Sequence, residues 1–248
     1  MRSIDGALLG LRLRKLWWLL RRPGSWPLLR AGVAPSLEHS GLLAGRRFNS
    51  LIDIGANRGQ FTVWAAAVLG VEHIVCVDPL PDADTYLTKV AAYLHPRRVT
   101  VINAALGSVR SRQTLHVTAA SDSSSLLPVA PVAELPSALR EVGRREVDVF
   151  AGDDVLTGPF DRPLLVKIDV QGSELDVLSG LGHVLTHADA ILVEVSFGDF
   201  YCGQSDPSAV IRSLLDSGFT LAGVARVPGS SRIWELDQAD LLFERRNS

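Results

Sequence analysis

Cysteine, lysine and long apolar runs are all scarce in this chain. Its two cysteines, Cys76 and Cys202, are too few for a disulfide framework, and no spacing of histidine and cysteine indicates a metal site. No segment approaches the roughly 18–20 apolar residues that a membrane-spanning helix requires. The formal net charge of −2 gives no indication of a nucleic-acid partner. We therefore expect a cytoplasmic protein with reduced thiols that neither spans a membrane nor binds nucleic acid.

Basic residues are concentrated at the start of the chain. Seven of the first 30 residues are lysine or arginine and one is acidic, and residues 6–22, GALLGLRLRKLWWLLRR, carry leucines at three- and four-residue spacings. This pattern predicts an amphipathic helix, followed by a proline-containing connector that extends to residue 47. A basic helix with tryptophans is typical of a segment that lies on an anionic membrane surface. The alternative is a helix that packs across the main domain by its leucines.

Residues 48–248 alternate between predicted strands and helices and form the main predicted domain. With 47% hydrophobic residues, the chain can bury a sizeable core. Strands are predicted at 50–54, 73–77, 99–103, 164–168, 190–195 and 219–224, and helices at 60–69, 82–94, 174–185 and 207–217. Such alternation indicates βαβ units, and therefore an α/β fold with a mostly parallel sheet. A final strand at 239–243 is expected to be antiparallel.

An excursion at about 107–160 interrupts this alternation. RQTLHVT, at 112–118, predicts an edge strand, whereas SDSSSLLPVAPVAELP, at 121–136, is polar and rich in proline. EVDVF, at 146–150, predicts a further strand. Segments at the carboxyl ends of parallel strands usually form substrate sites, so we expect the excursion to shape one.

The first predicted strand runs directly into a glycine loop, LIDIGANRGQ, at residues 51–60. A dinucleotide fingerprint requires G-x-G-x-x-G, but Asn57 occupies the second glycine position and the third glycine is absent. Asp53 would also place a carboxylate beside a diphosphate. These features favour S-adenosylmethionine, which has no phosphate and carries a cationic ammonium and sulfonium, with Gly55 and Gly59 in the turn beneath it. The structural alternative is a strand-to-helix turn with Asp53 as a buried cap.

The ends of the next two predicted strands carry further candidates for the donor site. HIVCVDP, at 73–79, carries Asp78 directly after its strand, 25 residues after Asp53, where a carboxylate accepts hydrogen bonds from both ribose hydroxyls. Without this spacing, Asp78 would be interpreted as a turn residue before Pro79. In VINAALG, Asn103 and Ala104 reach the region expected for adenine.

The order of these motifs resembles the FkbM-type class I methyltransferases. DIGANRG, VDP, NAALG, SSSL, LLVKIDVQGSELDVLSGL and LVEVS follow one another over about residues 50–197, and KIDVQGSE followed by a strand that ends in glutamate is the most specific part. The resemblance implies a Rossmann-like, seven-stranded, mostly parallel sheet with helices on both faces and an antiparallel last strand. It also implies S-adenosylmethionine as the cofactor and methyl transfer to an oxygen, commonly on a sugar or a polyketide-like product.

The residues that match the family's motifs form a donor-site set and a second cluster. The donor-site set is Asp53, Gly55, Asn57, Gly59, Asp78, Asn103 and Ala104. The second cluster is Lys167, Asp169, Gly172, Glu174 and Glu194. Two positions depart from the family: Asp78 is one methylene shorter than the usual glutamate, and Gln171 stands where an acid is common. The second departure argues against a metal-binding version of the cluster.

Lys167 and Asp169 share one face of a predicted central strand, because side chains alternate along residues 164–169. Glu194, at the end of the next predicted strand, faces them. Methyl transfer to an alcohol needs a base that takes the hydroxyl proton, a role that suits Asp169 or Glu194, made more basic by partial burial, with Lys167 positioning both. The alternative is a structural ion network beneath the site. For Glu174, a structural role at a helix start is favoured.

These features together predict an S-adenosylmethionine-dependent O-methyltransferase that acts on a small molecule or a glycolipid. The basic N-terminal segment and the arginine-rich composition favour a sugar hydroxyl on a glycolipid of the actinobacterial cell-envelope type, with peripheral contact to the inner membrane face through residues 6–22. A soluble polyketide or macrolide acceptor is the first alternative. A non-catalytic S-adenosylmethionine-binding protein is the second.

Overall fold

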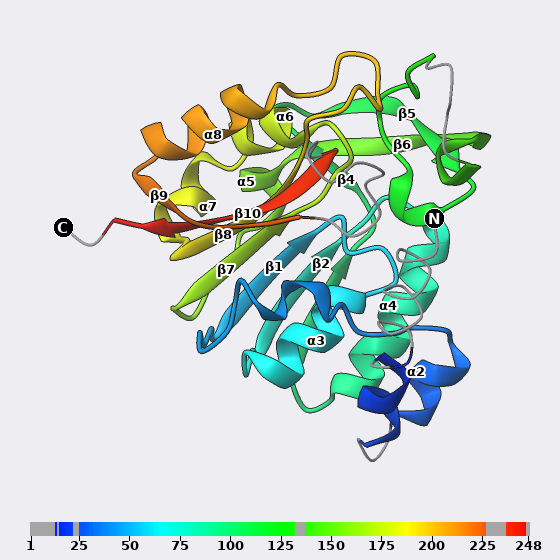
Figure 1. Cartoon of the computed structure of the whole chain (residues 1–248), viewed down its shortest axis with the longest axis vertical. Coiled ribbons are helices and arrows are strands. Elements are labelled where there is room, and N and C mark those ends of the chain that lie inside the picture. The colour runs from blue at the N-terminus through cyan, green and yellow to red at the C-terminus, as the bar shows by residue number, and fades with distance from the viewer. Residues whose placement is uncertain (1–12, 14, 22–24, 132–136, 227–236, 247–248) are drawn as a thin grey trace.

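A seven-stranded sheet forms the centre of the molecule (Figure 1). The computed structural model describes residues 13, 15–21, 25–131, 137–226 and 237–246. The strand order is β3-β2-β1-β7-β8-β10-β9, in which β10 is antiparallel to both of its neighbours and the other pairs are parallel. The strands are β1 (Ser50–Ile54), β2 (His73–Val77), β3 (Arg98–Ile102), β7 (Leu164–Ile168), β8 (Ala190–Ser196), β9 (Phe219–Arg226) and β10 (Gln238–Arg245).

Helices cover both faces of this sheet. One face carries α2 (Trp26–Arg30), α3 (Gln60–Val68) and α4 (Pro81–Leu94), and the other carries α5 (Gly152–Val155), α6 (Glu174–Ser179), α7 (Gly182–His187) and α8 (Pro207–Asp216). Consecutive residues of β1 alternate between the two cores, so Leu51 packs beneath α3 whereas Ile52 lies in the opposite core. Strands buried on both faces explain the unbroken apolar runs of the sequence.

The predicted α/β fold with a seven-stranded, mostly parallel sheet is confirmed, including the antiparallel last strand. That strand, β10, is inserted between β8 and β9 rather than added outside them, so β9 forms the edge. Three strands (β1, β2 and β7) have the predicted bounds, and β3, β8, β9 and β10 differ by one or two residues at one or both ends.

The helix predicted at 174–185 is two helices, α6 and α7, which meet at Gly180 and Leu181. Gly180 lies against the backbone of Gly107, and a Cβ at Gly180 would be 2.0 Å from the Gly107 carbonyl oxygen. Its own carbonyl accepts a hydrogen bond from the N–H of Asp153 at 2.9 Å. These contacts come from distant segments, which is why the local sequence pattern predicted a continuous helix.

The excursion folds into a second sheet with the order β4-β6-β5. Its elements are β4 (Ala105–Gly107), β5 (Ser111–Thr118), β6 (Glu141–Ala151) and the short helical turns η2 (Ser121–Ser123) and η3 (Ser137–Leu139). The strands β5 and β6 correspond to the predicted RQTLHVT and EVDVF segments, although β6 begins five residues before EVDVF. β4 was not predicted, because its three residues carry too short a pattern.

The predicted N-terminal helix is described in part, since residues 6–12, 14 and 22 lie outside the described residues. Residues 15–20 are helical, with Leu19 buried. The predicted connector contains α2 and the turn η1 (Glu38–Ser40), and its Leu28, Val33 and Leu43 are buried in the core beneath α3. Among the described helices, none is long and apolar enough to cross a lipid bilayer.

Gly180→Ala should lower the free energy of unfolding by about 1–3 kcal/mol, because its new methyl group would collide with the backbone of β4. Urea unfolding followed by circular dichroism measures the change. Gly41→Ala is the matched control, since a Cβ there meets no heavy atom within 4 Å and the backbone is already helical. Equal stabilities for the two variants would contradict the close contact at Gly180.

Candidate active site

A cavity of about 450 Å³ lies at the carboxyl ends of the parallel strands. This volume is within the range of small-molecule sites, about 300–1,000 Å³. Its walls come from the glycine loop, the end of β2, the excursion, and the ends of β7, β8 and β10. The predicted site residues in its lining are Gly55, Asn57, Asp78, Ala104, Lys167, Asp169 and Glu194.

The glycine loop brings the ends of β1 and β7 into contact. Gly55 has φ +77°, and a Cβ built on it would lie 1.8 Å from the carbonyl oxygen of Asp169. The N–H of Asp169 in turn donates to the carbonyl of Ile54 at 3.0 Å. No side chain fits between these strand ends, so position 55 requires glycine. Asn57 also has positive φ, +46°, and its side chain lines the cavity.

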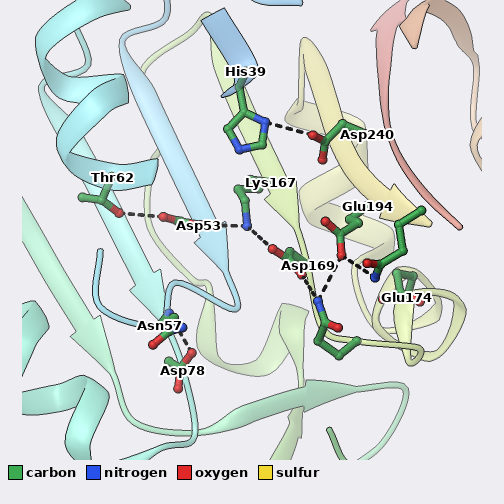
Figure 2. A network of polar contacts seen from close by, with 12 residues as sticks. His39, Asp53, Asn57, Thr62, Asp78, Lys167, Asp169, Glu174, Glu194 and Asp240 are labelled. Atoms are coloured by element: carbon green, nitrogen blue, oxygen red, sulfur yellow. Dashed lines mark hydrogen bonds and ion pairs between the residues drawn. The ribbon is translucent and has the colours of Figure 1, made fainter. Parts of the chain in front are cut away.

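Asp78 presents a fixed carboxylate at the end of β2 (Figure 2). The N–H of Asn57 donates to its Oδ2 at 2.8 Å, and the N–H of Leu80 donates to its Oδ1 at 2.9 Å. A carboxylate has about four lone-pair positions, so each oxygen keeps one for a hydroxyl in the cavity. Burial raises the pKa of Asp78 to about 6, although the two N–H donors oppose the shift. This arrangement fits a pair of neighbouring hydroxyl groups such as those of a ribose.

Three residues predicted to bind the donor, Asp53, Gly59 and Asn103, do not line the cavity. Asp53 is fully buried, with Oδ2 accepting a hydrogen bond from the Thr62 hydroxyl at 2.6 Å and Oδ1 lying 3.7 Å from Nζ of Lys167. Gly59, with φ +82°, packs closely against side chains of α4. Asn103 lines a separate cleft beside the second sheet. Each of these residues therefore supports the site from behind or beside it.

A row of charged side chains crosses four neighbouring strands at this edge of the sheet (Figure 2). The register places Asp53 of β1 beside Lys167 of β7, and Glu194 of β8 beside Asp240 of β10. Asp169 follows β7 directly, two residues after Lys167. Because side chains alternate along a strand, all five lie on the face that α3 covers. We call the four acids, Asp53, Asp169, Glu194 and Asp240, the carboxylate row.

Lys167 is the ammonium group within the carboxylate row. Its side chain is buried, and Nζ lies 3.1 Å from Oδ2 of Asp169 and 3.7 Å from Oδ1 of Asp53. Burial lowers the pKa of Lys167, but the carboxylates of Asp169 and Asp53 outweigh burial and raise the pKa above its ordinary value. Burial likewise raises the pKa of Asp53, and Lys167 opposes that shift. Two of the four acids, Asp53 and Asp169, contact this ammonium directly.

Amide side chains connect the acids at the β7 and β8 ends. Nε2 of Gln171 lies 2.7 Å from Oδ1 of Asp169 and 3.0 Å from Oε1 of Glu194, and Nε2 of Gln238 donates to the same Oε1 at 2.9 Å. Burial, together with the neighbouring Asp169 and Asp240, raises the pKa of Glu194 well above its ordinary value. This part of the cavity is lined by alternating carboxyl and amide groups.

The excursion forms the opposite wall of the cavity through residues 121–126. The Tyr201 hydroxyl lies 2.7 Å from the carbonyl oxygen of Ser123 and 3.1 Å from Oε1 of Gln171. The Ser125 hydroxyl donates to the Gln171 carbonyl at 2.6 Å. These bonds hold the excursion loop against the end of β7, beside the carboxylate row.

Glu174 does not line the cavity and instead contacts the backbone of the turn beside it. It is buried at the start of α6, and its Oε1 accepts the N–H of Gly172 at 2.9 Å. Burial raises its pKa to about 7, although backbone N–H groups oppose the shift. It therefore caps the turn that follows Asp169.

His39 and Asp240 line the cavity without having been predicted from the sequence. Nδ1 of His39 lies 3.1 Å from Oδ2 of Asp240, and the His39 ring meets Phe61 edge-on, with 5.0 Å between ring centroids. Asp240 had a signal, as the single charged residue of the predicted strand at 239–243. His39 had none, because it lies in a connector without a motif. Within the described chain, no three histidine, cysteine or carboxylate groups converge as metal ligands.

Comparison with known proteins identifies similar sequences and folds. The family model described as the methyltransferase FkbM domain matches residues 53–221. The hexuronic acid methyltransferase AglP of Haloferax volcanii is 33% identical over 57 residues, which cover 23% of this chain and 24% of that protein. The match therefore spans about a quarter of that relative.

Two solved structures illustrate the structural likeness. Precorrin-6y C5,15-methyltransferase of Geobacter metallireducens has a TM-score of 0.47 at 11% identity, covering 84% of this chain and 85% of that chain. Fibrillarin of Aeropyrum pernix, solved with natively bound S-adenosyl-L-methionine, has a TM-score of 0.46 at 11% identity, covering 80% of this chain and 67% of that chain.

Lys167→Met should lower the free energy of unfolding by about 3–5 kcal/mol, because it leaves the fully buried Asp53 beside an apolar side chain. Adding Asp53→Asn to that variant should restore part of the loss by removing the unpaired acid. Urea unfolding of the single and double variants measures both effects. Lys89→Met, on the exposed side of α4, is the control and should change stability by less than about 1 kcal/mol. A comparably small loss at Lys167 would show that its ammonium is not held in the carboxylate row.

Proposed function

Because the chain belongs to the FkbM methyltransferase family and uses S-adenosylmethionine, we propose that it methylates a sugar hydroxyl of a glycolipid. The observation that carries the proposal is the set of carboxyl and amide groups at the β7, β8 and β10 side of the cavity. Sugar hydroxyls both donate and accept hydrogen bonds, and such groups satisfy both functions. The short match to a hexuronic acid methyltransferase supports a sugar acceptor.

The donor occupies the β1 and β2 side of the cavity in this proposal. Bound there, it supplies a methyl group on a positively charged sulfur. Its contacts are Gly55, Asn57, Asp78 and Ala104, which line the cavity. Asp78 accepts the ribose hydroxyls, Ala104 borders the adenine, and Gly55 allows close approach of the backbone. Asp53, Gly59 and Asn103 act indirectly, by holding the glycine loop, α4 and the β3 end in place.

The acceptor lies at the carboxylate row. Asp169 and Glu194 contact its hydroxyls, and Lys167 keeps Asp169 in position through their 3.1 Å contact. Side by side, these two acids offer oxygens that accept hydrogen bonds from the acceptor's hydroxyls, and burial with neighbouring acids raises the pKa of Glu194 above its ordinary value. The acceptor oxygen is thereby held in line with the methyl group.

The N-terminal segment contacts the membrane that contains the glycolipid. Its exposed apolar side chains include Trp17, in helical residues 15–20, and Trp26, in α2, with 56% and 63% of their surface exposed. Leu19, on the side of its helix opposite Trp17, is buried. The guanidinium of Arg21 stacks on Trp17, 3.6 Å from the ring centroid. An apolar, tryptophan-containing surface in a segment whose first 30 residues include seven basic ones suits an anionic lipid surface.

Asp78→Asn should weaken S-adenosylmethionine binding by about 10–100-fold, because the uncharged amide offers one acceptor atom where the carboxylate offers two. In the wild type, affinity should fall as the pH drops below about 6, where Asp78 gains a proton. Isothermal titration calorimetry from pH 5 to 8 measures both effects. Asp84→Asn, at an exposed position of α4, serves as the control. Unchanged affinity of Asp78→Asn would remove this residue from the donor site.

Incubation with methyl-tritiated S-adenosylmethionine should label a component of an actinobacterial glycolipid extract. Replacing both Trp17 and Trp26 with serine should lower labelling about tenfold or more when the extract is embedded in anionic vesicles, and should abolish co-flotation with them. Labelling of the detergent-dispersed extract should be unchanged, because the cavity is intact. Val109→Ser, which removes another exposed apolar side chain, is the control. Donor binding without any labelled glycolipid would contradict the proposed acceptor.

A further inference from the structure

His39 and Asp240 approach the cavity from two ends of the chain. His39 lies in η1, before β1, and Asp240 lies in β10. Both fall outside residues 53–221, which match the family, so their pairing is not supplied by the family motifs. The imidazole is 12% exposed, and it lines the cavity beside the carboxylate row.

The surroundings of His39 hold its ring in one orientation. Phe61 and Trp64 of α3 pack against it, with centroid distances of 5.0 and 6.4 Å. Nδ1 lies 3.1 Å from Oδ2 of Asp240 without the alignment of a hydrogen bond. Figure 2 shows the ring above Lys167, with one nitrogen towards Asp240 and the other turned towards the middle of the row. The second nitrogen therefore faces Lys167 rather than Asp240.

The acids of the carboxylate row are less suited than His39 to take a proton. Asp169 accepts one hydrogen bond on each oxygen, from Lys167 and from Gln171, and is thereby engaged in the ion network of the row. Glu194 accepts hydrogen bonds from two amides at one oxygen, and burial among neighbouring acids raises its pKa above the ordinary value. Imidazole is the side chain that most often acts as a general base.

We propose that His39 is a catalytic residue that removes the proton from the acceptor hydroxyl, and that Asp240 is its positioning residue. The inference rests on the proposed O-methylation. The acceptor oxygen forms a bond to the methyl carbon, the carbon–sulfur bond breaks with its electron pair passing to sulfur, and the hydroxyl proton passes to the free nitrogen of His39. The products are a methyl ether, a neutral thioether and an imidazolium.

The carboxylate row favours this transfer electrostatically. The positive charge lost at sulfur reappears on His39, which lies beside Asp240 and close enough to Asp53 to affect it electrostatically. Negative groups arranged in advance around a developing positive charge stabilise the transition state without reorganisation. The 3.1 Å contact with Asp240 places Nδ1 against the carboxylate, so the second nitrogen is the one left to face the acceptor.

A titration of the histidine ring signals by NMR tests the position of His39 without an acceptor. The positive sulfur of S-adenosylmethionine should move the His39 titration midpoint about one pH unit or more below its value with neutral S-adenosylhomocysteine. Other charges facing the ring, from Asp240, Asp53, Lys167 and Glu38, are the same in both complexes. The His39→Gln spectrum assigns the signal. Equal midpoints would overturn the proposal, because the ring would then lie away from the reacting atoms.

Turnover of the detergent-dispersed glycolipid extract tests the chemical role. His39→Gln should lower kcat by about 100-fold or more while the Kd for S-adenosylmethionine stays within about threefold. Asp240→Asn should lower kcat about tenfold, and added imidazole should restore part of the activity of His39→Ala. His116→Gln is the matched control, since this buried histidine also pairs with a carboxylate, Glu141, at 2.8 Å but lies outside the cavity lining.

The two measurements separate failure of this proposal from failure of the proposed function. If the wild type labels no glycolipid, the acceptor assignment fails, and the NMR comparison still decides whether His39 faces the methyl group. If the wild type is active, folded His39→Gln with more than about a third of wild-type kcat would overturn the role of His39. If Asp169→Asn lowered kcat by about 100-fold while His39→Gln kept more than about a third of wild-type kcat, the base would be Asp169 instead.

Discussion

The site depends on the burial of Lys167 between Asp53 and Asp169. Parallel strands end at the same edge of the sheet, so residues that are far apart in sequence place their charges side by side there. Removing such charges from water is costly, and the cost is acceptable only where opposite charges and hydrogen bonds compensate it. Thr62 and Gln171 provide those further bonds on either side. A row held this way is rigid, which suits groups that must orient a reactant.

Backbone contacts limit variation on one side of the cavity, and side chains form the walls of the other. On the β1 and β2 side, the close contact of Gly55 with Asp169 and the two N–H groups on Asp78 leave little freedom for change. On the β7, β8 and β10 side, side chains form the walls, and the excursion and the N-terminal segment add residues from outside the sheet. The region that matches the family therefore contains the proposed donor side, while the flanking segments contribute His39 and Asp240 to the proposed acceptor side.

Much of the fold could be predicted because the strands are short, apolar and separated by clear helical patterns. The predicted bounds of β1, β2 and β7 are those observed, since burial on both faces makes these strands continuous apolar runs. Predictions were less accurate where distant segments intervene. Contact of Gly180 with Gly107 divides the predicted helix at 174–185, and β4 is too short to carry a pattern.

By itself, the sequence determined the alternation of strands and helices, the glycine loop and the order of the motifs, because these depend on residues that are close together in the chain. Only the tertiary structure decided which side chains face the cavity. Asp53 was expected to meet the donor, yet it is fully buried against Lys167, whereas His39, in a segment without a motif, lies beside Asp240. The physical reason is that strand register and the path of the connector bring these residues together, and no local pattern records either.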